Sequence, residues 1–153
     1  MPFESHEPQV HPTAFVAESA TLVGRVTLGE NSVVMFGAVV RADRDAITLG
    51  EGSNLQDNVV VHGDPGFPAR IGAGVSVGHS AVVHGATVED DCLIGMNATV
   101  LNGSVMGGDR SWQRDPWSWK VRSFLLVPSL PVFQEKSGVS SPRTNVTGFD
   151  GTP

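Results

Sequence analysis

Three histidines that could together bind a metal ion lie in one short stretch of the chain. His62, His79 and His84 are three of the five histidines, and all three fall between Gln56 and His84. Three imidazole ligands with one open position are the usual coordination of a catalytic zinc ion. Zinc in such a site lowers the pKa of bound water to about 7 and provides hydroxide at neutral pH. The alternative is that these are ordinary surface histidines, and the elements that carry them decide between the two.

An aliphatic residue recurs every six positions through most of the chain, and a small or β-branched residue follows four positions later. The count is interrupted at Arg41–Thr48 and Gly63–Arg70, and it includes one short step of five from Val83 to Val88. The aliphatic positions are Val10, Val16, Leu22, Leu28, Val34, Val40, Leu49, Leu55, Val61, Ile71, Val77, Val83, Val88, Ile94 and Val100. The small or β-branched positions are Ala14, Ala20, Val26, Ser32, Ala38, Val75, Ala81, Thr87, Cys92, Ala98 and Ser104.

A period of six fits neither an isolated helix nor a simple meander of strands. It is typical of a hexapeptide parallel β-helix, in which three hexads close one triangular coil around the aliphatic side chains. An ordinary β-sandwich is the alternative, but the phase of six survives both interruptions. The sequence therefore predicts an all-β fold, and the repeat resembles that of left-handed parallel β-helices over residues 1–105.

The coil count places two of the histidines together. Neighbouring coils stack about 4.8 Å apart, so residues one coil apart lie above one another. His62 and His84 both follow an aliphatic position, and they are one coil apart once the four extra residues of the second interruption are subtracted. Arg41 falls in the same column, one coil earlier. We therefore expect His62 and His84 to be adjacent on one face.

His79 is expected on a different column, around a corner from the pair and one coil after Asp57. Its side chain then points away from His62 and His84 of the same chain. If three copies pack side by side, His79 of one copy can face the pair of the next, which gives a site repeated by three-fold symmetry.

Composition narrows the class of protein. The net charge of −6 and the lack of any Lys/Arg cluster argue against a nucleic-acid partner. No apolar run reaches the length of a membrane span, and the first residues do not form a signal peptide. The single Cys92 excludes an internal disulfide. A cytoplasmic protein is expected.

The hexad pattern stops after Val105, and all three tryptophans, Trp112, Trp117 and Trp119, come later. When the codons are read one base earlier, the genetic code permits small and aliphatic residues in the missing pattern. We therefore interpret residues 106–153 as an out-of-frame tail, from a frameshift or a sequencing error, and expect it to be largely disordered. The alternative is a family-specific extension, and the coding DNA distinguishes the two.

Four segments resemble the motifs of γ-class carbonic anhydrases, and the similarity extends over roughly Val10 to Val105. They are Arg41-Ala-Asp43, Asn54-Leu-Gln56-Asp57, Val61-His62 and Gly78–Gly85. The resemblance implies a homotrimer that converts CO₂ to bicarbonate reversibly, using metal-bound hydroxide. His62, His79 and His84 match the histidines that bind Zn²⁺, or Fe²⁺ or Co²⁺, between two subunits of that family.

The same resemblance gives roles to five further residues. Gln56 matches a residue that orients the metal-bound water, and Asn54 matches a polar residue near the site. Matches at Arg41, Asp43 and Asp57 imply ion pairs at the subunit interface.

Two departures from that family leave other functions open. Arg44 stands where active members carry an acid, and the loop Gly63–Arg70 is short, with Asp64 as its only acid. Proton export is then expected to be slow. One alternative is a hexapeptide-repeat acyltransferase that uses coenzyme A and a histidine general base without metal. Others are a thioesterase-like accessory protein and a non-catalytic metal-binding trimeric scaffold.

Overall fold

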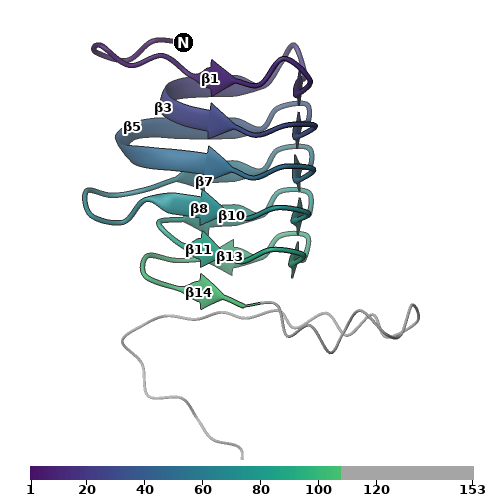
Figure 1. Ribbon diagram of the computed structural model, residues 1–153. Coiled ribbons are helices and arrows are strands. Elements are labelled where there is room, and N and C mark those ends of the chain that lie inside the picture. The colour runs from purple at the N-terminus through teal and green to yellow at the C-terminus, as the bar shows by residue number, and fades with distance from the viewer. Residues whose placement is uncertain (108–153) are drawn as a thin grey trace, which may run out of the picture.

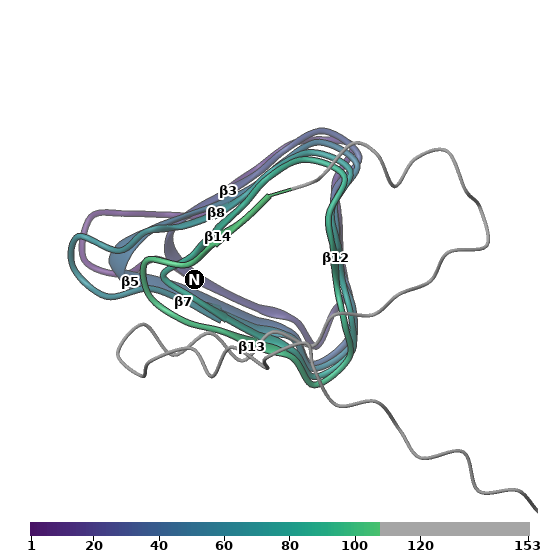
Figure 2. The same ribbon diagram turned by 90° about the horizontal axis from the view of Figure 1, so that it is seen from below.

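The chain winds into a three-sided parallel β-helix in the computed structural model, which describes residues 1–107 (Figures 1 and 2). All regular elements of these residues are strands, and paired strands on successive coils run parallel. In Figure 2, which looks along the coil axis, the chain turns clockwise as it comes toward the viewer, and this is the left-handed sense. The predicted fold class, an all-β left-handed parallel β-helix of hexapeptide repeats, is confirmed.

Two sheets form the three sides of the prism. The first covers two sides and contains β1 (Gln9–Val10), β3 (Thr21–Leu28), β5 (Val39–Leu49), β7 (Val60–His62), β8 (Ala69–Ile71), β10 (Val82–His84), β11 (Thr87–Val88), β13 (Thr99–Val100) and β14 (Val105–Met106). The second contains β2 (Phe15–Val16), β4 (Val33–Val34), β6 (Asn54–Leu55), β9 (Ser76–Val77) and β12 (Leu93–Ile94). The long strand β5 joins two sides, because its start pairs with β7 and its end pairs with β8.

The predicted aliphatic positions fill the interior of the prism. From Leu22 to Val100 each of them is buried, and together they form one continuous core. On the first coil, which no earlier coil covers, Val10 is exposed and Val16 is only partly buried. The burial of an unbroken aliphatic column is the main source of stability in this fold, because each coil hides its apolar side chains only against its neighbours.

The short step between Val83 and Val88 corrects one assignment. Thr87 was predicted to be the small residue at the corner, but it is only half-buried in β11, whereas Ala86 is buried. A step of five residues brings the corner one position earlier. Gly85 makes this tighter turn with φ +57, a left-handed conformation that glycine adopts without steric cost.

The two interruptions of the repeat are protrusions from the prism. At the first, β5 stays continuous, and its pairing with β3 shifts register opposite Gly24–Val26. At the second, a tight turn closes between Asp64 and Phe67, with a 2.8 Å hydrogen bond from the Phe67 N–H to the Asp64 carbonyl oxygen. Both protrusions leave the corner beside His62, so they carry polar side chains to the histidine pair.

Candidate metal centre

His62 and His84 lie side by side on adjacent coils. They end β7 and β10, which pair in parallel with His84 opposite His62. His62 Nδ1 lies 3.0 Å from His84 Nε2, and the two ring planes meet at 63°. Arg41 is opposite His62 on the preceding coil. The predicted column of the two histidines and Arg41 is therefore confirmed.

Asn102 fixes the tautomer of His84. The amide nitrogen of Asn102 donates to Asp64 Oδ2 at 2.9 Å, and its Oδ1 lies 2.7 Å from His84 Nδ1. An amide oxygen only accepts hydrogen bonds, so His84 Nδ1 carries the proton. The lone pair of a neutral His84 then lies on Nε2, which is the atom that faces His62.

Asp43 holds the other edge of His62. Asp43 Oδ1 lies 2.9 Å from His62 Nε2, and Asp43 Oδ2 accepts a 2.5 Å hydrogen bond from Arg41. Burial raises the pKa of Asp43, but hydrogen bonds to His62 and Arg41 outweigh it, and the net pKa is below the usual 3.8. Asp43 is therefore a carboxylate at neutral pH that orients His62, as carboxylates commonly do for metal-binding histidines. Arg41 and Asp43 pair within one chain, and their role at a subunit interface stays a prediction.

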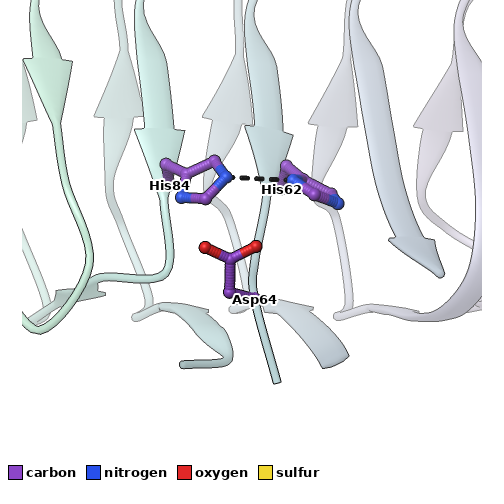
Figure 3. Close-up of side chains that lie close together, drawn as sticks. All are labelled: His62, Asp64 and His84. Carbon is purple, nitrogen blue, oxygen red and sulfur yellow. Dashed lines mark hydrogen bonds between the residues drawn. The ribbon is translucent and has the colours of Figure 1, made fainter. Parts of the chain in front are cut away.

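Asp64 is a third potential ligand beside the two histidines. One ligand atom from each of His62, Asp64 and His84 lies within 4.8 Å of the other two. Figure 3 shows the Asp64 carboxylate pointing toward the space between the rings. The hydrogen bond from Asn102 lowers the pKa of Asp64, burial raises it, and the charges of His84, His62 and Arg44 lower it again, with a net decrease. An ionised carboxylate therefore faces the pair.

Sequence reasoning noted Asp64 as the only acid of its loop but did not identify it as a ligand, and it missed Asn102. The residue types gave a signal for Asp64, since it lies two residues after His62 and is followed by Pro65 and Gly66. Pro-Gly favours a tight turn, which brings the chain back toward the strand it has just left. Asn102 gave no such signal, because its role depends on a side-chain direction that the hexad count does not fix.

His79 lies at another corner, as predicted, and outside the group formed by His62, Asp64 and His84. Its Nδ1 is 3.0 Å from Asp57 Oδ2, and 51% of its side-chain surface is exposed. The predicted column of Asp57 and His79 is therefore confirmed. The Nε2 atom of His79 has no hydrogen-bond partner among the described residues.

Asn54 and Gln56 belong to the side of the prism that leads to His79. Ser76 donates to Asn54 Oδ1 at 3.0 Å, and Gln56 Nε2 donates to Ser76 Oγ at 3.5 Å. Neither side chain is hydrogen-bonded to His62 or His84 within the described part of the chain. Their predicted roles at the metal therefore require a neighbouring copy, as does the role of His79.

The geometry of the histidine pair fits a metal ion. Two nitrogens bound at about 2.0–2.1 Å in a tetrahedral arrangement lie about 3.3 Å apart. The 3.0 Å between His62 Nδ1 and His84 Nε2 needs only a small adjustment to accept an ion. The donor set of imidazole and carboxylate suits Zn²⁺, Fe²⁺ and Co²⁺.

Comparisons with known proteins agree with this fold. A family model described as "Hexapeptide repeat of succinyl-transferase" matches residues 68–102. A solved hexapeptide transferase family protein from Anaplasma phagocytophilum is 31% identical with a TM-score of 0.61, over 68% of this chain and 72% of that chain. These findings define a hexapeptide-repeat β-helix protein.

Two curated relatives narrow the family. Gamma carbonic anhydrase 2, mitochondrial, of Arabidopsis thaliana is 46% identical over 65% of this chain and 38% of its own length. A probable carbonic anhydrase of Methanocaldococcus jannaschii is 51% identical over 56% of this chain and 54% of its own length. The chain thus spans about half or less of these relatives. The chain belongs to the hexapeptide-repeat family, and over the matched residues it is similar to γ-carbonic anhydrases.

Among residues 1–107, no helix is long and apolar enough to cross a membrane. The compartment stays a prediction, since the Arabidopsis relative is named mitochondrial. The out-of-frame tail and the domain boundary at residue 105 also stay predictions, because residues 108–153 lie outside the described part of the chain.

Proposed function

We propose that this chain is a subunit of a γ-carbonic-anhydrase-like metalloenzyme that hydrates CO₂ reversibly to bicarbonate. The observation that carries the proposal is the register of β7 and β10, which puts His62 Nδ1 and His84 Nε2 3.0 Å apart. Asp43 and Asn102 hold the outer nitrogens of the two rings, so the inner nitrogens face one another. Metal-binding histidines are commonly oriented in this way by a hydrogen bond to the ring nitrogen that does not bind the metal.

The third ligand in this proposal is His79 of an adjacent copy in a homotrimer. The Asp57 carboxylate contacts Nδ1 of His79, so Nε2 is the nitrogen that could bind a metal across the interface. The corner that carries His79 is also apolar. Phe36 lies at this corner one coil before Asp57, and Met96 lies there one coil after His79. Their side chains are 49% and 69% exposed. Exposed apolar side chains in a row indicate a contact surface, and closed three-fold symmetry would bury this one.

The residues have separate roles in the proposed reaction. A divalent ion, Zn²⁺, Fe²⁺ or Co²⁺, would supply hydroxide at neutral pH for attack on CO₂. His62, His84 and the neighbouring His79 would hold it, while Asp43, Asp57 and Asn102 would orient the three rings. In the assembled trimer Gln56 and Asn54 would approach the site together with the neighbouring His79, and Gln56 would orient the reacting water.

Stopped-flow CO₂ hydration by the metal-loaded full chain tests this proposal. Loss of a residue that only orients a metal ligand lowers metal affinity or activity about 10–100-fold. The variant His84→Ala removes a ligand itself, so its activity and its metal affinity are expected to fall by more than that. His11→Ala is the control, because His11 bonds to Thr13 on the first coils and lies away from the pair. Full activity in His84→Ala, or none in the wild-type chain with metal bound, would refute the proposal.

A hexapeptide-repeat acyltransferase is the second candidate, and the pair of His79 and Asp57 favours it. An exposed imidazole whose Nδ1 is held by a carboxylate at 3.0 Å can act as a general base through Nε2. Transfer of an acyl group from coenzyme A that survives chelator and is lost in His79→Ala would support this candidate. Absence of such transfer under conditions that permit CO₂ hydration would exclude it.

A further inference from the structure

We propose that His62, His84 and Asp64 form a metal site that is complete within one chain and needs no residue of a neighbouring copy. The proposal deepens the proposed function, on which it rests for the two histidines as ligands. The new element is Asp64, which takes the position that His79 of an adjacent copy would take in the assembled trimer. Each copy can then capture a metal ion before it assembles.

The geometry of the three side chains supports this site. The ligand atoms of His62, Asp64 and His84 lie within 4.8 Å of one another, and Figure 3 shows all three facing one space. Asp64 Oδ2 accepts the hydrogen bond from Asn102. Within residues 1–107, Asp64 Oδ1 accepts no hydrogen bond. One oxygen therefore fixes the carboxylate while the other is available to an ion.

The loop after β7 is built to hold Asp64 in this position. Pro65 and Gly66 are the central residues of the turn, and Gly66 has φ +83, which the second central position of a type II turn requires. The Gly66 N–H donates to Asp45 Oδ2 at 2.9 Å, so the protrusion of the preceding coil braces the turn. Asn102 holds the Asp64 carboxylate from the following coil. Contacts from both neighbouring coils reduce the ordering cost of binding an ion.

The donor set has a defined chemistry. Two imidazoles and one carboxylate on one side of an ion, with the remaining positions open, suit Fe²⁺ and Zn²⁺, and Co²⁺ can report on them. The carboxylate also offsets one of the two positive charges of the ion, which a third imidazole does not. We therefore expect tight binding of a divalent cation by a single chain.

Cobalt titration of the full chain in a His79→Ala background tests the inference, because this variant removes the neighbouring ligand in any oligomeric state. The His79→Ala chain is expected to bind one Co²⁺ per copy, seen in its visible absorption. Adding Asp64→Asn should weaken binding at least about tenfold, the lower end of what loss of an outer partner costs. Adding Glu30→Gln, an exposed carboxylate on another coil, should leave the affinity unchanged.

Two results would overturn the one-chain site. One is no Co²⁺ binding by folded His79→Ala chain, and the other is equal affinity with and without Asp64→Asn. Asp64→Glu keeps the charge and guards against loss of folding: it should bind Co²⁺ with a shifted absorption spectrum, and an unchanged spectrum contradicts the inference.

Carbonic anhydrase assays on the same variants separate the inference from the proposed function. Loss of CO₂ hydration in His79→Ala while Co²⁺ stays bound supports both the shared catalytic site and the one-chain site. Retained hydration in His79→Ala refutes the shared three-histidine site and leaves the one-chain site standing. Equal Co²⁺ affinity with and without Asp64→Asn refutes the one-chain site alone.

Discussion

A Cβ atom placed on Gly85 would overlap Asn102 Oδ1, the atom that accepts the proton of His84 Nδ1. The space left by this glycine therefore allows Asn102 to reach His84 across one coil. The same Cβ would also lie 2.9 Å from the Cβ of Phe67 in the loop that carries Asp64. The turn at Gly85 after β10 thus affects the positions of Asn102 and of the Asp64 loop at the proposed metal site.

The substitution Gly85→Ala is expected to destabilise the fold and weaken metal binding. The left-handed φ of +57 costs an alanine roughly 1–2 kcal/mol, and displacement of Asn102 adds about 1–3 kcal/mol of overpacking. Gly52→Ala is the control, since Gly52 has φ +63 but open space around its Cβ position. Urea unfolding measures the stability of the two variants. Equal losses in the two variants would show that the contact with Asn102 is unimportant.

Substitutions of Asn102 test its role in orienting His84. Asn102→Ala removes the acceptor for His84 Nδ1 and should lower metal affinity about 10–100-fold. Asn102→Asp keeps that acceptor but puts a carboxylate against Asp64, so it should move Asp64 while His84 stays oriented. Calorimetric titration with Zn²⁺ gives the affinities. Wild-type affinity in Asn102→Ala would contradict the orienting role.

The sequence was sufficient to predict the histidine column but not the complete site. The register of His62 with His84 follows from counting hexads, because each coil has a fixed number of residues and the loop length can be subtracted. The positions of Asp64 and Asn102 do not follow from that count, since they depend on a turn and on side-chain directions outside the repeat. The prediction that Thr87 is the corner residue was wrong for a related reason. A step of five residues does not show which of the usual six positions is missing, and the buried residue at this corner is Ala86.

Burial of the hexad positions predicts a sharp contrast between two leucines of the second sheet. Leu55 is fully buried, whereas Leu93 points outward and is 51% exposed. Leu55→Ala should cost roughly 2–5 kcal/mol of stability, and Leu93→Ala should change it by about 0.5 kcal/mol or less. Thermal unfolding of the two variants gives the comparison. Similar losses at both positions would be inconsistent with an interior filled by the six-residue repeat.

The single cysteine is expected to react slowly with alkylating reagents. Burial raises the pKa of Cys92 above the usual 9.0, and the carboxylates of Glu89, Asp91 and Asp90 raise it further. Since the thiolate is the reactive form, the folded protein should stay nearly unreactive at pH 8 and gain reactivity only as the pH rises beyond 9.0. Iodoacetamide labelling followed by mass spectrometry measures the rate. Labelling at pH 8 as fast in the folded chain as in urea would contradict this.

X-ray absorption at the zinc edge of the zinc-loaded chain tests most directly whether His62 and His84 bind one ion. The predicted spectrum has nitrogen or oxygen neighbours at about 2.0–2.1 Å, with the outer-shell scattering of at least two imidazoles. The double variant His62→Ala/His84→Ala should lose that scattering together with the bound zinc. A wild-type spectrum without imidazole scattering, or a double variant that still shows it, would contradict a metal centre at this histidine pair.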